Sequence, residues 1–211
     1  VAPEVDLVAV KICVTDGNGC PDFAVILGIE FVLDPNDDGS MDDKVDIVNF
    51  SLGVARTSGF YSIVAKAFDD IFELGVLTIV ASGNEENIPY VMGDVSKSTY
   101  AISVGAIGNP QSLTAKTAAS YTARGPGENN SIKPNIVAPS RFAMAEAGTG
   151  NGYFRAAGTS FSAPIVAGAA ALLIERCPEC SPFAIRTILM NNADPTVKYF
   201  RFNDLRAPVS L

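Results

Sequence analysis

Strand-like apolar segments alternate along this chain with helix-like segments, and this alternation constrains the fold more than any other feature. The expected strands are short apolar runs at residues 7–12, 46–50, 76–81 and 100–104. The expected helices have apolar residues at helical spacing, at residues 21–33, 62–74, 160–176 and 181–192. Residues 108–152 form a looser region rich in Gly, Pro, Ser and Thr. The pattern predicts an α/β domain with a largely parallel sheet.

Composition sets limits on size and on partners. Of the 211 residues, 48% are hydrophobic and 18% are charged, which fits one ordered domain over residues 1–211. The net charge of -8 argues against a nucleic-acid partner, because nucleic acids bind basic surfaces. The longest apolar run, 163–174, is too short to span a bilayer and contains Gly168. We therefore expect no nucleic-acid and no membrane partner.

Four cysteines form two local pairs, Cys13 with Cys20 and Cys177 with Cys180. An even number in local pairs is typical of disulfides and of an oxidising, extracellular compartment. Two alternatives stay open at this point. Cys177 and Cys180 could be half of a zinc site, although the chain has no histidine to complete it, or the cysteines could be free thiols.

Two expected strands are followed by residues that could take part in binding or catalysis. Ligands bind at the carboxyl ends of the strands in parallel sheets, and Ser51-Leu52-Gly53 and Ala81-Ser82-Gly83-Asn84 lie there. An Asn amide can donate a hydrogen bond to a developing oxyanion, and Gly53 permits the close approach of an extended chain. Taken singly, each segment also fits an ordinary turn at the end of a strand.

Ser160 opens the expected helix 160–176, which is apolar almost all round and therefore central in the core. The positive end of the helix dipole and the free backbone N–H groups favour negative charge at such a serine. By itself, however, a serine at this position is more often a helix cap.

Five segments in their order along the chain change this balance, and together they resemble the subtilisin-like serine peptidases (subtilases, peptidase family S8) of the secreted bacterial type. They are Asp46-Ile-Val-Asn-Phe-Ser-Leu-Gly53, Val80-Ala-Ser-Gly-Asn84, Ser120-Tyr-Thr-Ala-Arg-Gly-Pro126, Lys133-Pro-Asn-Ile-Val-Ala-Pro139 and Gly158-Thr-Ser-Phe-Ser-Ala-Pro-Ile-Val-Ala-Gly168. The resemblance implies a three-layer subtilisin-like fold with a mostly parallel central sheet, incomplete at the N-terminus.

The resemblance also implies roles for individual residues. Ser160 would be the acyl nucleophile, and Asn84 would be the side-chain donor of the oxyanion hole, together with the backbone N–H of Ser160. The implied reaction is hydrolysis of protein or peptide substrates through an acyl-enzyme. The walls of the pocket for the residue before the scissile bond would be Ser51, Leu52, Gly53, Ala81, Ser82 and Gly83.

An acidic stretch at residues 34–43 places oxygen ligands at alternate positions and Gly39 at the sixth. It resembles the start of an EF-hand loop but has Val45 where the glutamate at position twelve belongs, so we expect no complete EF-hand. A solvated acidic turn is the alternative. The stretch also resembles one in some secreted bacterial-type subtilases, including the upstream Cys13–Cys20 loop. That supports a structural Ca²⁺ with ligands Asp34, Asn36, Asp38, Asp42 and the carbonyl of Ser40.

The chain contains no histidine, although the family's triad needs a histidine base and an aspartate. In family order both precede the segment that matches Val1-Ala2-Pro3, so we expect a missing N-terminal segment that carries them and little activity from this chain alone. Two alternatives remain. One is a sedolisin-type acid peptidase, although that pattern has Asp where this chain has Asn84. The other is a non-catalytic pseudoprotease that binds peptides along the Ser51-Leu52-Gly53 edge.

Overall fold

Four parallel strands form the central sheet of the protein. The computed structural model describes residues 1–14, 19–53, 62–86, 89–108, 117–127, 130–145 and 152–194. The strands lie in the order β1-β2-β3-β4, so strands adjacent in sequence are adjacent in the sheet. Their bounds are β1 (Ile47–Phe50), β2 (Leu77–Ala81), β3 (Ile102–Ile107) and β4 (Ile136–Pro139).

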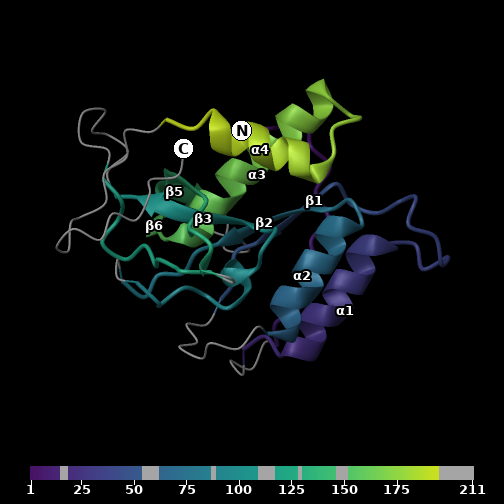
Figure 1. Ribbon diagram of the computed structural model, residues 1–211, viewed down its shortest axis with the longest axis horizontal. Coiled ribbons are helices and arrows are strands. Elements are labelled where there is room, and N and C mark those ends of the chain that lie inside the picture. The colour runs from purple at the N-terminus through teal and green to yellow at the C-terminus, as the bar shows by residue number, and fades with distance from the viewer. Residues whose placement is uncertain are drawn as a thin grey trace.

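Helices cover both faces of this sheet, as Figure 1 shows: α1 and α2 lie on one side, and α3 and α4 lie on the other. The molecule is therefore a three-layer α/β/α structure, as the alternation of segments predicts. The bounds are α1 (Asp22–Leu33), α2 (Ile63–Glu73), the short 3-10 helix η1 (Val95–Lys97), α3 (Thr159–Arg176) and α4 (Pro182–Asn191). None of the helices in the described ranges is both long and apolar enough to cross a bilayer.

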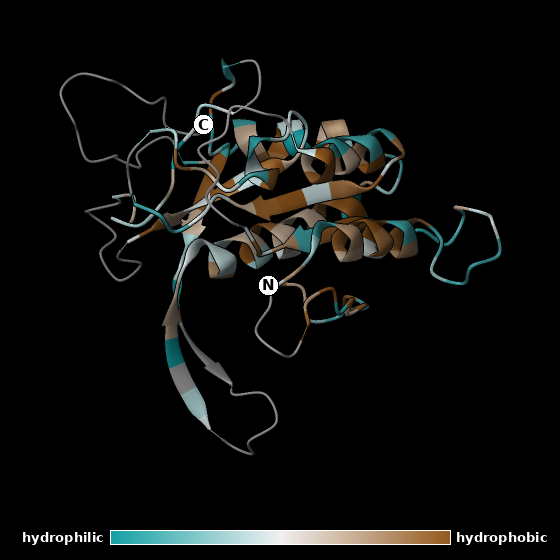
Figure 2. Ribbon diagram, turned by 90° about the horizontal axis from the view of Figure 1, so that it is seen from below, coloured by the Kyte–Doolittle hydropathy of each residue, from teal (hydrophilic) through white to brown (hydrophobic). Residues whose placement is uncertain are grey.

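Each face of the sheet has its own hydrophobic core, and β2 contributes to both. All five residues of β2 are buried. Ile79 packs in the core that contains Ala163 and Val166 of α3, whereas Val80 packs in the core that contains residues of α1 and α2. The alternating directions of side chains along a strand account for this division. Figure 2 shows the apolar strands enclosed between helices whose inner surfaces are also apolar.

Side-chain caps set the starts of two helices. The Ser62 hydroxyl accepts a hydrogen bond from the Ala65 N–H (3.0 Å) at the start of α2. The Ser181 hydroxyl accepts one from the Ala184 N–H (3.3 Å), and Pro182 follows as the first residue of α4. Both starts agree with the sequence-based prediction, because a hydroxyl acceptor and an N-terminal proline are strong local signals.

The prediction of a buried strand at residues 7–12 is wrong. The segment forms no ladder with the sheet, and Leu7 and Val8 are 89% and 55% exposed. Val10 and Ile12 still pack against the core under α1 and α2, close to Gly28. An apolar run thus identifies side chains that can be buried, but it does not specify a partner strand.

Strand β3 begins two residues later than the sequence predicts, and Asp69 of α2 explains the shift. Its buried carboxylate accepts hydrogen bonds from the backbone N–H groups of Thr99 (3.1 Å) and Tyr100 (2.8 Å), and from the Ser98 hydroxyl (2.6 Å). The backbone N–H groups of residues 99 and 100 therefore bind the Asp69 carboxylate instead of β2, and the ladder with β2 begins at Ile102.

A two-stranded antiparallel ribbon pairs β5 (Arg141–Ala145) with β6 (Tyr153–Ala157). Strand β5 lies within the Gly- and Pro-rich region 108–152, where the sequence predicts no regular strand, and β6 follows directly after that region. In Figure 2 the ribbon extends away from the body of the molecule. Its last residue directly precedes Gly158, so the ribbon leads into the N-terminus of α3.

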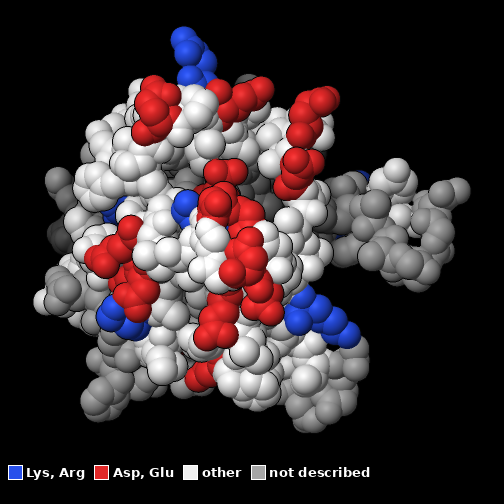
Figure 3. Space-filling view, turned by 90° about the vertical axis from the view of Figure 1, so that its right-hand side faces the viewer, with Lys and Arg blue, Asp and Glu red and all other residues white. Residues whose placement is uncertain are grey.

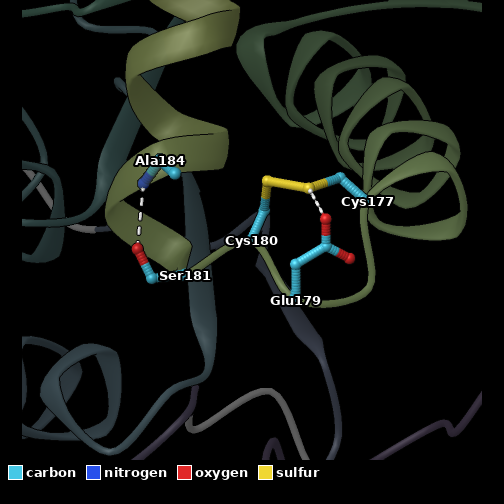
Figure 4. The surroundings of a disulfide bond; sticks show 5 residues. All are labelled: Cys177, Glu179, Cys180, Ser181 and Ala184. Carbon is cyan, nitrogen blue, oxygen red and sulfur yellow. Dashed lines mark hydrogen bonds between the residues drawn. A yellow bond between two sulfur atoms is a disulfide. The ribbon is translucent and has the colours of Figure 1, made fainter.

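The four cysteines form two disulfides in the structure. Cys13 pairs with Cys20 and Cys177 with Cys180, with Cα–Cα distances of 4.1 and 5.4 Å. Figure 4 shows the second bridge between the end of α3 and the start of α4, beside Glu179 and the Ser181 cap. Cys180 also packs against the core that contains Ile185. The bridge therefore joins the ends of the two helices on this face.

Candidate active site

The carboxyl ends of β1 and β2 meet the N-terminus of α3, and the residues that the sequence singled out converge at this junction. Ser51 follows β1, Asn84 follows β2, and Ser160 is the second residue of α3. Hydrogen bonds join Ser51 to Ser160 and Asn84 to Thr159. The parallel sheet thus brings together residues more than a hundred positions apart.

Ser160 and Ser51 exchange hydrogen bonds. The Ser160 hydroxyl donates to the Ser51 carbonyl (3.0 Å), and the Ser51 hydroxyl donates to the Ser160 carbonyl (3.0 Å). Both residues are half-buried. A carbonyl oxygen is too weak a base to remove the hydroxyl proton, so this contact positions Ser160 without activating it.

Two hydrogen bonds to its oxygen fix the orientation of the Asn84 side-chain amide. Its Oδ1 accepts hydrogen bonds from the backbone N–H (2.9 Å) and from the hydroxyl (3.1 Å) of Thr159, the first residue of α3. Because Oδ1 faces two donors, the NH₂ group of Asn84 is left as the side-chain donor at this helix terminus. That arrangement suits a site where negative charge develops.

Residues 81–83 form a tightly constrained loop below Asn84. Ala81 and Ser82 are buried, and the Ser82 N–H donates to the Val104 carbonyl of β3 (2.9 Å). Gly83 has a φ of +112°, a conformation that is strained for residues with a side chain, and a Cβ there would lie 3.2 Å from both the Ala123 Cβ and the Gly93 backbone nitrogen. Glycine is therefore required at position 83, where its N–H donates to the Thr159 hydroxyl (3.2 Å).

Gly93 links the two segments that were expected to be pocket walls, and the sequence analysis did not identify it. Its N–H donates to the Ser82 carbonyl (3.0 Å), and a Cβ built on Gly53 would lie 3.6 Å from its Cα. Thr159 was likewise missed as a functional residue. Thr159 adjoins Ser160 in the same motif, and this position could have indicated a functional role. Gly93 has no side chain, so its sequence context gives no such indication.

The acidic loop between α1 and β1 folds around its own backbone. The Asp34 carboxylate accepts hydrogen bonds from the N–H groups of Asp38 (3.1 Å) and Gly39 (2.8 Å), and Asp38 accepts one from Ser40 N–H (2.8 Å). Asn36 also accepts from the Asp38 N–H (2.9 Å), whereas Asp42 donates its own N–H to the Ser40 hydroxyl (3.3 Å). Within the described ranges, no three His, Cys, Asp or Glu side chains come together to hold a metal ion.

Comparison with known proteins places the chain among peptidases. Serine protease AprX of Bacillus subtilis (strain 168) is 29% identical over 211 residues, a match that covers 92% of this chain and 47% of AprX. Subtilisin DY of Bacillus licheniformis is 29% identical over 195 residues, covering 92% of this chain and 62% of that protein. The chain thus spans about half to three fifths of the length of these relatives.

The solved structure of sphericase has the same fold. It superposes with a TM-score of 0.74 at 22% identity, over 93% of this chain and 64% of that one. The profile of the subtilase family matches residues 1–206. Since this match takes in β1, β2 and α3, and with them the junction of Ser51, Asn84 and Ser160, the chain belongs to the subtilase family of peptidases.

Proposed function

We propose that this protein is a serine endopeptidase in which Ser160 forms an acyl-enzyme with the substrate. The observation that carries the proposal is the junction at α3, where the Ser160 hydroxyl bonds the Ser51 carbonyl and the neighbouring Thr159 fixes the oxygen of the Asn84 amide. A nucleophile at a helix N-terminus next to a pre-oriented amide donor suits acyl transfer, because the anionic intermediate meets donors that need no reorganisation.

In this mechanism the Ser160 Oγ attacks the scissile carbonyl carbon. The oxygen that becomes negative is stabilised by the Asn84 NH₂ group and by the backbone N–H of Ser160. Ser51, Leu52 and Gly53 form one wall of the pocket for the residue before the scissile bond, and residues 81–83 form the other. Leu52 is 39% exposed and Ser82 is buried, so the first wall offers side-chain surface and the second mainly backbone.

The proton of Ser160 needs a base that the 211 residues do not contain, since they include no histidine. We place the histidine and its aspartate partner on a segment of the full-length protein that precedes Val1. Residues 1–211 then form the C-terminal portion of the catalytic domain. On its own this portion hydrolyses peptides poorly, because Ser160 keeps an unactivated hydroxyl.

A structural Ca²⁺ at the loop between α1 and β1 is the second part of the proposal. The donor set fits the ion, since Asp34, Asn36, Asp38 and Asp42 supply hard oxygen ligands and Ser40 supplies its carbonyl. Five carboxylates lie within residues 34–43 of this loop, and Figure 3 shows a side of the molecule on which Asp and Glu dominate. A divalent cation would relieve their mutual repulsion. Both disulfides further favour an extracellular location for the protein.

Peptide cleavage by the full-length protein tests the enzymatic proposal. We expect wild-type protein to cleave an unfolded protein substrate at internal bonds, and the Ser160→Ala variant to lose this activity by several orders of magnitude. Cleavage that is optimal in acid would instead favour a sedolisin-type peptidase.

A non-catalytic peptide-binding role is the alternative, and the resting contact between the Ser160 hydroxyl and the Ser51 carbonyl is the observation that favours it. Binding of peptides by a folded full-length protein that does not cleave them would establish this role.

A further inference from the structure

Pro164 removes a hydrogen-bond donor from the first turns of α3. In a regular α-helix the N–H of residue 164 donates to the carbonyl of residue 160. Proline has no N–H, and Pro164 lies inside α3, which begins at Thr159. The carbonyl of Ser160, the proposed nucleophile, therefore lacks its regular helical partner.

A side chain from another part of the sheet supplies a replacement donor. The Ser51 hydroxyl donates to the Ser160 carbonyl at 3.0 Å, in a partly buried contact between residues 109 positions apart. The Asn49 side-chain NH₂ in turn donates to the Ser51 hydroxyl oxygen at 3.0 Å. Because that oxygen accepts from Asn49, its own hydrogen is free to point toward Ser160.

From this arrangement we infer that Ser51 is a positioning residue for the nucleophile. Its hydroxyl replaces the helical donor that Pro164 lacks, and it ties the first turn of α3 to the end of β1. The return bond from the Ser160 hydroxyl to the Ser51 carbonyl, also 3.0 Å, completes a two-way clamp. The inference rests on the proposed role of Ser160 and adds a role for the Ser51 hydroxyl beyond its place in the proposed pocket wall.

The clamp matters because the position of Ser160 and Asn84 relative to the bound substrate decides how well both act on it. A displacement of about 1 Å in a catalytic group can lower a rate by roughly 100-fold. Asn84 is fixed to Thr159, the neighbour of Ser160, so a shift of this turn moves the nucleophile and the amide donor together away from the substrate wall at residues 51–53.

The first experiment replaces Ser51 in the full-length protein and measures the rate of Ser160 labelling by a fluorophosphonate. We expect Ser51→Ala to lower this rate by about 10-fold, because the first turn of α3 loses its tie to β1 and Ser160 is less well placed for attack. Ser51→Thr keeps a hydroxyl and should restore most of the rate. The pH profile should keep its shape, and KM for a peptide should change less than kcat, because Ser51 neither titrates nor loses its backbone wall.

The second experiment restores the missing donor. Pro164→Ala gives residue 164 an N–H that can reach the Ser160 carbonyl, so the Ser51 hydroxyl becomes redundant. In this background we expect Ser51→Ala to lower the labelling rate by no more than about 2-fold, a non-additivity typical of residues that share a partner. The thermal midpoints of wild type, Ser51→Ala, Pro164→Ala and the double variant should show coupling of the same sign. The control is Ser62→Ala, which removes a hydroxyl that caps α2 and should lower the midpoint without changing the labelling rate.

Two results would overturn the inference: labelling of Ser51→Ala at the wild-type rate, or equal losses from Ser51→Ala with proline and with alanine at position 164. If wild-type protein is not labelled at all, the proposed function fails instead. In that case the coupling of the thermal midpoints still decides whether Ser51 replaces the donor that Pro164 lacks.

Discussion

Thr159 fixes the orientation of the Asn84 side-chain amide. Its N–H and hydroxyl both bind Asn84 Oδ1, at 2.9 and 3.1 Å, so a rotated amide would oppose two donors with its own NH₂ group. The sequence singled out Asn84 and Ser160 as candidates because five segments occur in the order of the subtilase family, although each motif by itself also fits a turn or a helix cap. It did not identify Thr159 as a positioning residue, because a threonine before a helix is usually a cap and only the fold brings Asn84 to it.

The Asn84–Thr159 contact predicts graded losses of activity. Asn84→Ala should lower kcat by about 100-fold to 1,000-fold, as expected for loss of one oxyanion donor, with little change in KM. Thr159→Val removes one of the two donors to Oδ1 and should lower kcat by about 10-fold, whereas Thr159→Ser should stay close to wild type. Steady-state kinetics on a peptide substrate measure both. Equal kcat values for wild type and Asn84→Ala would remove Asn84 from the mechanism.

At the scale of elements, local signals predicted helices better than strands. The starts of α2 and α4 were predictable because Ser62 and Ser181 are caps whose backbone N–H donors lie close in sequence. The segment 7–12 was misassigned because strand pairing depends on a distant partner. The start of β3 was misplaced because Asp69 of α2 takes the backbone donors at residues 99 and 100, a contact that no local pattern contains.

The loop between α1 and β1 should respond to calcium as a unit. Binding to the native loop alone stabilises the folded state by mass action, so millimolar Ca²⁺ should raise the thermal midpoint over that in a chelator. The double substitution Asp34→Asn and Asp38→Asn should abolish the increase, whereas Asp22→Asn, at the start of α1 outside the loop, should preserve it. An identical midpoint in calcium and in chelator would contradict the proposed ion.

At the scale of the whole molecule, a buried polar network around Lys133 joins β3 to the segment that precedes β4. The Lys133 Nζ donates to the Ala101 carbonyl (2.7 Å) and to Asn135 Oδ1 (3.0 Å), which also accepts from the Ser103 N–H (2.9 Å). Burial lowers the pKa of Lys133 to about 7, with a further decrease from Arg186 of α4 and an opposing effect from Asp69 of α2. The sequence did not predict this buried lysine, because an isolated lysine is normally exposed.

The lowered pKa of Lys133 predicts that the free energy of unfolding rises with pH above neutrality. Its folded-state pKa of about 7 lies below the ordinary 10.5, so the unfolded chain binds more protons between these values. The free energy of unfolding should therefore increase by up to about 1.4 kcal/mol per pH unit in this window, and the contribution should be constant below pH 7. Lys133→Met should remove this slope in denaturant unfolding at a series of pH values. Lys11→Met, at an exposed site, is the control for the loss of one positive charge; an unchanged slope in Lys133→Met would contradict the assignment.

Ser160 at the start of α3 is the proposed acyl nucleophile, and the site of covalent modification by a fluorophosphonate is the sharpest test of this role. Full-length protein is treated with the fluorophosphonate, digested, and analysed by mass spectrometry to locate the adduct. We expect a single adduct on Ser160 that is absent from Ser160→Ala. An adduct on another serine, or its persistence in Ser160→Ala, would contradict it.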